Sequence, residues 1–375
     1  MKSADEPVLV LNGGSSSIKF ALFDAGQPPR LIDRGTIEAA AGGNGLDEIE
    51  DRLATALGGR QFVAVGHRLV HGGPELRDPR RLTPQLTAQL QQLVPFAPNH
   101  LPAELRLIEA VVRRWPDVPQ VVCFDTAFHS ELPARAFELP LARRHAAAGI
   151  RRYGFHGLSY TFLMQELTRR AGTAASGRVI LAHLGNGSSL AAVRDSLSID
   201  TTMGFTPIGG VVMGTRTGDL DPGIVVQIAR RDHMDATALE HELSQESGLL
   251  GISGRSADMR ELLAHESSDE RCRLAVEIYC YEIRKRIGAY AAALGGLDIL
   301  VFSGGIGEHA APVRARICDG LAFLGIELDE NSNARHAAVI SRDTAPVIVH
   351  VIPANEELVI AEAVFRLLDD YDRDT

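Results

Sequence analysis

The chain has 375 residues and a mass of 40.4 kDa, a length that predicts two domains, with three as the alternative. Its 45% hydrophobic and 23% charged residues are typical of a globular protein and exclude a disordered chain. The formal net charge of -10 argues against binding to the phosphate backbone of nucleic acids. Since no uncharged apolar run reaches the ~18 residues of a transmembrane helix, we expect neither nucleic acid nor a membrane as a partner.

The four cysteines are Cys123, Cys272, Cys280 and Cys318, and none forms a CxxC pair. Four cysteines in a chain of this length do not make a disulfide framework, so we expect buried thiols in a reducing compartment. The N-terminus, MKSADEPVLV, has no basic segment followed by a sustained apolar one and therefore predicts no secretory signal. Together these features predict a cytoplasmic protein.

The first predicted elements form a hairpin. Residues 8–11 are an apolar run that ends at Asn12, and residues 18–23 alternate in polarity as a second strand does. Further on, Thr83-Pro84 has the sequence of a helix start, with a cap residue and a proline in the first turn. A second helix is predicted over residues 102–115.

On that second helix, Leu105, Ile108, Val112 and Trp115 are predicted to form one buried stripe, with Trp115 in the core. A long helix is predicted over residues 269–294. It ends at two consecutive glycines, and a strand follows over residues 299–302.

The most informative feature is an internal similarity. Residues 8–18 read VLVLNGGSSSI and residues 180–190 read ILAHLGNGSSL, so a shift of 172 aligns Gly13 with Gly185. Both segments are an apolar run, a turn of small residues and a second strand. This pattern favours a duplicated domain with a phosphate-binding hairpin in each half, although a chance similarity of two Gly/Ser turns would look the same. Two such hairpins facing each other would hold a nucleotide across a cleft.

The first turn, Asn12 to Lys19, is glycine-rich, then serine-rich, then basic. Glycines allow backbone amides to approach a phosphate, serine hydroxyls donate further hydrogen bonds, and Lys19 adds a positive charge. Only three of the 38 basic residues are lysines, which makes this lysine informative. The segment is no Walker A loop, because a strand follows it rather than a helix.

Eight blocks of sequence resemble the acetate kinase family and occur in the family's order. They are VLNGGSSSIKF, GHRLVHGG (66–73), FDTAFH (124–129), RRYGFHGLSY (151–160), AHLGNGSS (182–189), MGFTPIGGVVMGTRTGDLDP (203–222), FSGGIGEH (302–309) and IPANEELVIAEA (352–363). The resemblance covers nearly the whole chain. The family comprises acetate, propionate and butyrate kinases, which move phosphate between ATP and a short carboxylate.

The resemblance implies an α/β fold of two duplicated RNase H-like domains, as in actin, Hsp70 and sugar kinases, with a nucleotide cleft between the domains. We expect an N-terminal domain over residues 1–150 plus 358–375 and a C-terminal, nucleotide-binding domain over residues 151–357. It also implies Mg²⁺, with Mn²⁺ as a substitute, ATP or ADP as co-substrate, and a homodimer. The implied reaction is the reversible, direct in-line transfer that converts ATP and acetate into acetyl phosphate and ADP.

The predicted substrate site contains two arginines. Arg68 and Arg216 lie in glycine-rich blocks, and a planar, permanently charged guanidinium suits a carboxylate or a phosphoryl group. By resemblance, Arg68 binds acetate and Arg216 stabilises the transition state, while Val70 and Pro207 form the apolar wall of the acyl pocket.

His156 and Asp125 complete the predicted catalytic set. By resemblance, His156 donates a hydrogen bond to the transferring phosphoryl group, and an in-line transfer needs no phosphohistidine. Asp125 follows an apolar run, at the position where a carboxylate meets the cleft of an α/β sheet. It orients the acceptor or anchors magnesium through water. No general base is needed, because acetate is already ionised at pH 7.

The remaining candidates bind metal and nucleotide by resemblance. Asn12 and Glu356 supply the oxygen ligands that magnesium prefers, although Glu356 and Glu357 would equally stabilise the start of a helix. The nucleotide candidates are Lys19, His183, Leu184, Gly185, Asn186, Gly187, Asp258, Met259, Arg260, Gly304, Gly305, Ile306, Gly307 and Glu308.

The sequence departs from the family near the acyl pocket. Where the family has APLHNP, this chain has APNHLP, so Asn99 and Leu101 replace a leucine and an asparagine. Gly209 replaces a glutamate, and His309 replaces an asparagine. We expect Leu101 to turn inward and compensate for Asn99. The alternatives to an acetate kinase are a propionate or other short-acyl kinase and a non-catalytic, Hsp70-like nucleotide-binding module.

Overall fold

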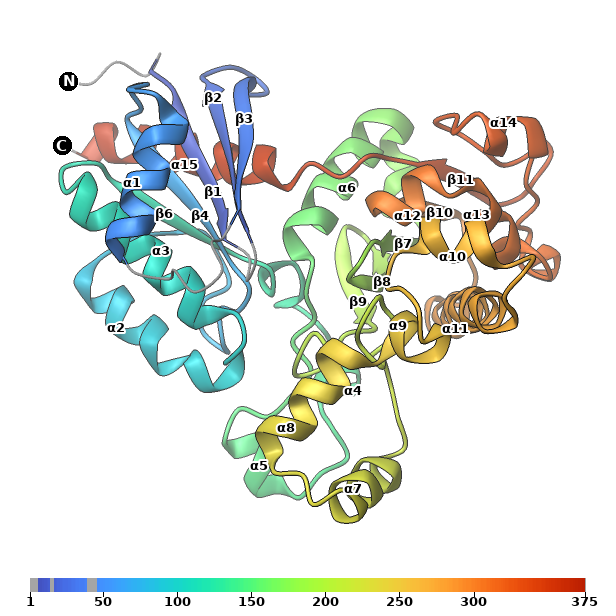
Figure 1. Ribbon diagram of the computed structural model, residues 1–375. Coiled ribbons are helices and arrows are strands. Elements are labelled where there is room, and N and C mark those ends of the chain that lie inside the picture. Colours follow the sequence, from blue (N-terminus) through green and yellow to red (C-terminus); the bar gives the residue numbers. More distant parts are fainter. Residues whose placement is uncertain (1–5, 14–16, 39–45, 375) are drawn as a thin grey trace. The chain divides into compact units, whose positions relative to one another are not determined.

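The computed structural model describes residues 6–13, 17–38 and 46–374 (Figure 1). The chain divides into two compact units, each formed by more than one segment. Unit 1 comprises Met1–Ser130, Gly157–Phe162 and Asn355–Thr375, and unit 2 comprises Glu131–His156 and Leu163–Ala354. The sequence places the domain boundaries at residues 150 and 358. These boundaries remain a prediction, and the two units are described as the structure divides them.

Unit 1 contains a six-stranded sheet in the order β3-β2-β1-β4-β6-β5. Its strands are β1 (Val8–Gly13), β2 (Ser17–Asp24), β3 (Arg30–Glu38), β4 (Ala64–Leu69), β5 (Arg80–Arg81) and β6 (Gln120–Phe124). Strands β1, β2 and β3 form an antiparallel meander, while β4 and β6 run parallel to β1. The predicted hairpin is therefore confirmed, with Asn12 opposite Lys19.

Helices cover both faces of the unit 1 sheet (Figure 1). The main ones are α1 (Leu46–Leu57), α2 (Pro84–Gln92), α3 (Leu101–Arg114) and α15 (Glu356–Asp374). Because side chains alternate along a strand, Val8 and Val10 pack on one face against α15, while Leu9 and Leu11 pack on the other against α1 and α3. Two hydrophobic layers thus hold the sheet between helices.

Unit 2 repeats the topology with a five-stranded sheet in the order β11-β10-β7-β8-β9. Its strands are β7 (Val179–Leu184), β8 (Ser188–Arg194), β9 (Leu197–Thr201), β10 (Ile299–Ser303) and β11 (Ile348–Val351). As in unit 1, the first three strands form an antiparallel meander and the last two run parallel to the first. Since β7–β8 corresponds to β1–β2, the duplication inferred from the two Gly/Ser turns is confirmed.

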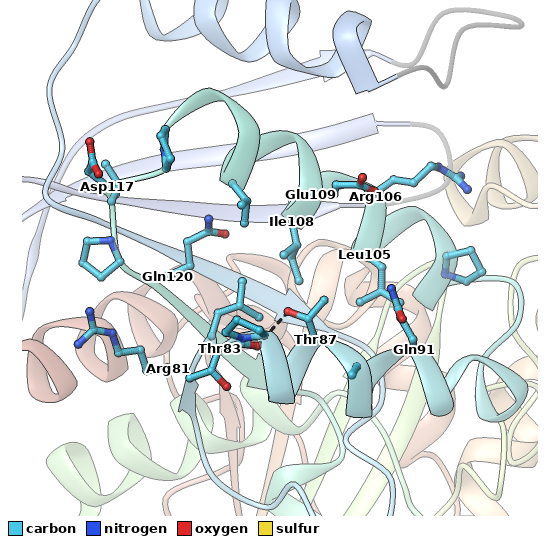
Figure 2. A pocket seen from close by; sticks show the side chains of 18 residues that line it. Arg81, Thr83, Thr87, Gln91, Leu105, Arg106, Ile108, Glu109, Asp117 and Gln120 are labelled. Carbon is cyan, nitrogen blue, oxygen red and sulfur yellow. Dashed lines mark hydrogen bonds between the residues drawn. The ribbon is translucent and has the colours of Figure 1, made fainter.

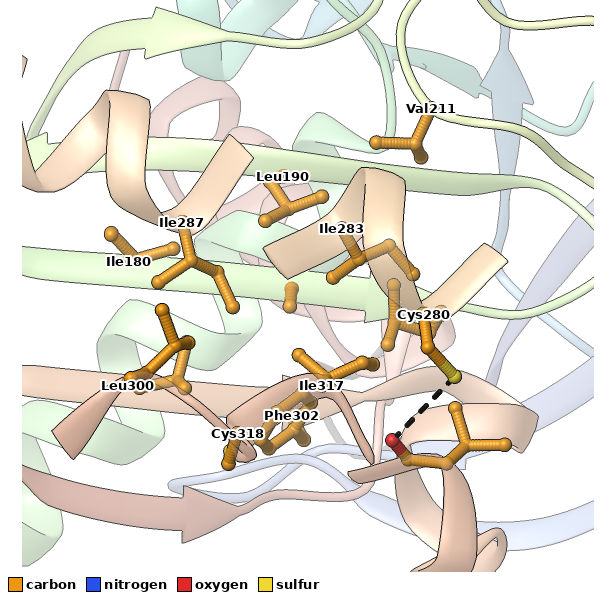
Figure 3. Packing of buried hydrophobic residues seen from close by; sticks show 14 of the residues in the cluster. Ile180, Leu190, Val211, Cys280, Ile283, Ile287, Leu300, Phe302, Ile317 and Cys318 are labelled. Carbon is orange, nitrogen blue, oxygen red and sulfur yellow. Dashed lines mark hydrogen bonds between the residues drawn. The ribbon is translucent and has the colours of Figure 1, made fainter. Parts of the chain in front are cut away.

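The helices of unit 2 differ widely in length. They are α4 (Ala134–Phe137), α5 (Arg143–Ala147), α6 (Gly157–Ala171, whose first six residues count with unit 1), α7 (Pro222–Arg231), α8 (Ala236–His241), α9 (Gly248–Ser253), α10 (Met259–His265), α11 (Glu270–Leu294), α12 (Gly304–His309), α13 (Ala311–Cys318) and α14 (Glu330–Ala334). Figure 3 shows the main core, in which Ile283 and Ile287 of α11 pack on Ile180 and Leu190 of the sheet.

Several local predictions are confirmed. The Thr83 hydroxyl accepts the Leu86 N–H and so caps α2, and Asp269 caps α11, which ends at Gly295 in a left-handed conformation. Strand β10 matches the predicted strand 299–302. All four cysteines are buried and free.

The predicted stripe on α3 is partly wrong. Ile108 is buried, but Val112 is 43% exposed, and the buried face instead carries Leu107 and Val111. The buried face of α3 therefore differs from the predicted one. It is the face that packs against both α1 and the sheet. Trp115, predicted in the core, is half-buried and packs edge-on against Phe62 at the margin of the core. Among the described residues, no helix is long and apolar enough to cross a membrane.

Candidate active site

In unit 1, a charged cluster forms where parallel strands β4 and β6 end. Arg68 lies in β4 opposite Cys123, and Asp125 follows β6, its N–H donating to Leu69 O at 2.9 Å. The Arg68 Nε donates to Asp125 Oδ1 at 3.2 Å, and its Nη2 pairs with Asp125 Oδ2. Because Asp125 is only 1% exposed, this two-point ion pair is shielded from water.

Two of the predicted metal ligands adjoin the same guanidinium. Arg68 Nη1 donates to Asn12 Oδ1 at 3.4 Å, and Arg68 Nε lies 3.9 Å from Glu356 Oε2. Burial raises the pKa of Glu356, while Arg68 and Lys19 oppose that rise. Burial also disfavours the charge on Arg68, but Asp125, Glu356 and Glu104 outweigh it and raise the pKa of the guanidinium. Arg68 is therefore a fixed positive charge among carboxylates.

Glu104 also belongs to this cluster, although it was not among the residues predicted for the site. It lies on the buried face of α3 and is 3% exposed. Its Oε2 accepts the Val70 N–H at 3.0 Å, and its Oε1 lies 3.9 Å from Arg68 Nη1. Burial raises the pKa of Glu104 from 4.5 to about 7, against the opposing effect of Arg68. A glutamate among apolar helix positions was the available signal.

In unit 2, a second cluster surrounds His156, the residue before α6. His156 has φ 60°, a left-handed conformation that is uncommon for a residue with a side chain. Its Nδ1 lies 2.8 Å from Ser189 Oγ, and its ring lies 4.5 Å from that of His183. His183 and Ser189 face each other across β7 and β8, so the hairpin itself holds both neighbours of the ring.

Arg216 reaches the same place from the 203–218 loop. Its Nη1 donates to Pro207 O at 3.1 Å. A Cβ added to Gly187 would lie 3.3 Å from His156 Nε2 and 3.5 Å from Arg216 Nη1. His156 Nε2 and Arg216 Nη1 therefore both lie close to Gly187. Because glycine has no side chain, space remains between these two groups and the backbone.

The turn of the β7–β8 hairpin contains the predicted phosphate-binding residues. The Gly185 N–H donates to Gly187 O, and Asn186 O accepts the Gly214 N–H, each at 3.0 Å. The side chain of Leu184 is fully buried in the core, so only its backbone could contact a nucleotide. Asn186 is exposed.

The 304–308 segment follows β10, as predicted, and forms the short helix α12. Gly304 has φ 76°, and a Cβ there would lie 2.7 Å from Leu184 O, so the chain passes very close to the phosphate turn. Glu308 Oε1 accepts the N–H groups of Gly304 at 2.9 Å and Ala354 at 3.0 Å, so it joins the 304–308 segment to the segment that precedes α15.

The third nucleotide segment surrounds the start of α10. Asp258 caps this helix and forms an ion pair with Arg260 at 2.6 Å, while Met259 between them is buried in the core.

Each unit thus gathers its own share of the predicted residues. Unit 1 contains Asn12, Lys19, Arg68, Val70, Asp125 and Glu356, and unit 2 contains His156, His183–Gly187, Pro207, Arg216, Asp258–Arg260 and Gly304–Glu308. The predicted phosphate nest also includes Gly14, Ser15 and Ser16, which lie outside the described residues.

The residues that depart from the family lie in different environments. Asn99 is exposed, whereas Leu101 is fully buried. A Cβ at Gly209 would lie 3.2 Å from Asp219 Oδ1, and Asp219 also accepts the Gly210 N–H at 2.7 Å. His309 is exposed and lies 3.8 Å from Glu308.

A cavity of about 830 Å³ lies between α2, α3 and the start of β6 (Figure 2). Leu105, Ile108, Thr87 and Gln120 are among its lining residues, and none of the predicted site residues is. In the parts of the chain that the structure describes, no group of three or more His, Cys, Asp or Glu side chains is placed to hold a metal. Asn12 and Glu356 are only two donors, but both are oxygen donors, and magnesium binds through few carboxylates while keeping water.

The repeated sheet topology, with the two parallel strands joined to a meander, is that of the actin, Hsp70 and sugar kinase superfamily. A model of the family described as "Acetokinase family" matches residues 33–362. The chain is 44% identical to an acetate kinase of Rhodopseudomonas palustris, over 96% of this chain and 98% of the relative. It is 42% identical to a propionate kinase of Citrobacter rodentium, over 96% of both.

Among solved structures, the chain is similar to the Porphyromonas gingivalis acetate kinase, with a TM-score of 0.88 at 34% identity, over 97% of this chain and 100% of that one. The chain therefore belongs to the acetokinase family. It is a kinase, with ATP as its co-substrate.

Proposed function

We propose that this kinase transfers the γ-phosphoryl group of ATP to acetate, reversibly, giving acetyl phosphate and ADP. The observation that carries the proposal is the convergence of His156 and Arg216 on Gly187 in a chain of this family. Two donors aimed at one space suit a group on which negative charge accumulates.

In this proposal Arg68 binds the acceptor carboxylate. Asp125 holds the guanidinium at two points, so the orientation of Arg68 is set before the acceptor arrives. We assign Val70, which is buried in unit 1, and Pro207, which is buried in unit 2, to the apolar side of the acyl pocket. Acetate is ionised at neutral pH and attacks without a general base.

Arg216 and His156 act on the phosphoryl group during its transfer. The guanidinium neutralises charge on the equatorial oxygens, and the imidazole donates a hydrogen bond from Nε2. The transfer is direct and in-line, so no covalent phosphohistidine is formed.

We propose Asn12 and Glu356 as the residues that hold Mg²⁺, with Mn²⁺ as a substitute. When bound, the ion neutralises charge on the phosphate oxygens. The support is that both side chains are oxygen donors, which magnesium prefers, and that both belong to one cluster in unit 1. Asp125 contacts the metal at most through water, because both of its oxygens pair with Arg68.

The nucleotide is assigned to the glycine-rich turns. His183, Gly185, Asn186 and Gly187, with the backbone of Leu184, would contact its phosphates, together with Lys19. Asp258, Met259, Arg260 and Gly304, Gly305, Ile306, Gly307 and Glu308 would surround the adenosine. The support is the close approach of Gly304 to Leu184.

A second candidate acceptor is propionate. The 42% identical propionate kinase of Citrobacter rodentium favours it. One methylene in an apolar pocket changes binding by only ~1 to 3 kcal/mol, so a kinase of this class accepts both acids to different extents. A non-catalytic nucleotide-binding module would have no use for Arg68, Asp125, His156 and Arg216.

We also propose a homodimer in the cytoplasm. Helix α7 has no buried residue, and it exposes Ile224 and Val226, each 47% exposed. Ile224 and the half-buried Ile228 lie four residues apart and therefore share one face of this helix, and an apolar face of this kind supports an interface. The location is supported by the four free thiols. Light scattering of the wild type and of Ile224→Glu tests the dimer, since the variant should shift to monomer.

The acceptor is tested by trapping the acyl phosphate with hydroxylamine and measuring kcat/KM for acetate, propionate and butyrate. We expect acetate to give the highest value. A higher kcat/KM for propionate would contradict the proposal and identify propionate as the preferred acceptor.

A further inference from the structure

The imidazole of His156 lies within hydrogen-bonding distance of the hydroxyl of Ser189. Its Oγ lies 2.8 Å from His156 Nδ1, and the serine is fully buried. Ser189 lies within β8, where its backbone pairs with that of His183. A hydroxyl on a central strand of a buried sheet has a fixed position, so the imidazole edge that meets it is fixed as well.

The opposite edge of the ring faces the proposed phosphoryl site. His156 Nε2 points at Gly187, in the space that Arg216 Nη1 also reaches. The ring of His183 lies 4.5 Å away and is tilted by 32°, so it limits the rotation of His156 from the side. The orientation of the imidazole is therefore determined by Ser189 at one end and by packing along its face.

A neutral imidazole has one N–H and one acceptor nitrogen, and the partner of one nitrogen decides the state of the other. If the Ser189 hydroxyl donates to Nδ1, the proton must reside on Nε2. Nε2–H is then a donor directed to the same space as the Arg216 guanidinium. Two donors directed at one space match a phosphoryl group.

We propose that Ser189 is a positioning residue for phosphoryl transfer: its hydroxyl donates to His156 Nδ1 and keeps Nε2 protonated toward the phosphoryl group. The inference rests on the proposed role of His156. It assigns a function to a serine of β8 that the sequence marks only as part of a Gly/Ser-rich hairpin.

The direct test is the tautomer of His156, measured by two-bond ¹H–¹⁵N correlation spectra of the protein at a pH at which the ring is neutral. His156→Gln identifies the signal. We expect an acceptor-type Nδ1 and a protonated Nε2 in the wild type, and a mixture of tautomers in Ser189→Ala. A wild type with the proton on Nδ1 overturns the proposal without any measurement of activity.

Kinetics supply the second readout. Ser189→Ala should lower kcat about tenfold. This is less than the ~10²-fold loss expected when a transition-state donor is removed entirely, because the imidazole remains. The KM for ATP should stay within twofold of the wild-type value. Ser189→Thr, which keeps a hydroxyl, should recover most of the loss. Ser198→Ala removes another buried serine hydroxyl from the same sheet, on β9, and should leave kcat unchanged.

The outcomes separate the two proposals. If His156→Gln loses activity but Ser189→Ala keeps that of the wild type, the positioning role of Ser189 is wrong and the proposed function stands. If His156→Gln keeps full activity, the proposed role of His156 itself is wrong.

Discussion

Arg68 and Asp125 form a two-point ion pair at the carboxyl ends of the neighbouring strands β4 and β6, although 57 residues separate them. The pairing follows from the parallel register, which aligns the ends of the two strands at one edge of the sheet. Its consequence is a guanidinium whose Nε and Nη2 are occupied, while Nη1 faces Asn12 and Glu104. Binding of an acceptor carboxylate must therefore use a preoriented arginine surrounded by other carboxylates.

Replacement of Arg216 by alanine should lower kcat by about 10²-fold or more, since it removes a charged contact to the transition state. ATP affinity should stay close to that of the wild type. Steady-state kinetics measure the first quantity and fluorescence titration the second. Arg231→Ala, an exposed arginine paired with Asp232, is the control. A kcat near the wild-type value would remove Arg216 from the active site.

Glu356 and Glu357 both lie in the first turn of α15, and among the described residues it is Glu356 whose Oε2 lies 3.9 Å from Arg68 Nε. Glu356→Ala should therefore raise the magnesium concentration needed for half-maximal activity far more than Glu357→Ala does. Activity is titrated with Mg²⁺ at saturating ATP and acetate. Coincident titration curves for the two variants would assign both residues to stabilisation of the helix start.

Asn99 is exposed and Leu101 fully buried, an arrangement that agrees with an inward leucine. Asn99→Leu should therefore leave the ratio of kcat/KM for acetate to that for glycolate unchanged within about twofold, because the amide does not set the polarity of the acyl pocket. Kinetics with both acids and with propionate measure the ratio. A rise of several-fold would instead make Asn99 a wall of that pocket.

Glu104 predicts a specific pH dependence of stability. Burial raises its pKa to about 7 in the folded protein from 4.5, so the folded state binds the proton more tightly than the unfolded state does. The contribution of this carboxyl to stability is then full below about pH 4.5 and is lost as the pH rises through 7.

Glu104→Gln removes this titration. Its Tm relative to the wild type should increase between pH 5 and pH 8, as measured by thermal melts in matched buffers. Glu109→Gln, an exposed glutamate on the same helix, should show no such trend. Parallel pH profiles for wild type and Glu104→Gln would contradict the raised pKa.

The duplicated hairpins were predictable because their signal is local. Gly13 and Gly185 each end an apolar run and precede a strand, and the spacing alone relates them. The caps at Thr83 and Asp269 are local in the same sense. Features that depend on a few consecutive residues, such as these hairpins and helix caps, can therefore be predicted from the sequence.

Long-range packing was not predictable. The exposed Val112 follows from the contact of α3 with α1, which helical periodicity does not encode. Glu104 has the polarity of a surface residue and is buried because α3 brings it to Val70 and Arg68. Ser189 was visible only as a turn serine, and its contact with His156 arises from the fold of unit 2. Residues of this kind need the tertiary structure.

The central claim, transfer of a phosphoryl group from ATP to acetate, is tested most directly by ³¹P NMR of the purified protein with ATP, acetate and Mg²⁺. The account predicts that the γ-phosphorus signal of ATP is replaced by that of acetyl phosphate, with ADP formed in equal amount. It also predicts that acetyl phosphate and ADP regenerate ATP. Release of inorganic phosphate alone, or ATP left unconsumed in the presence of acetate, would contradict it.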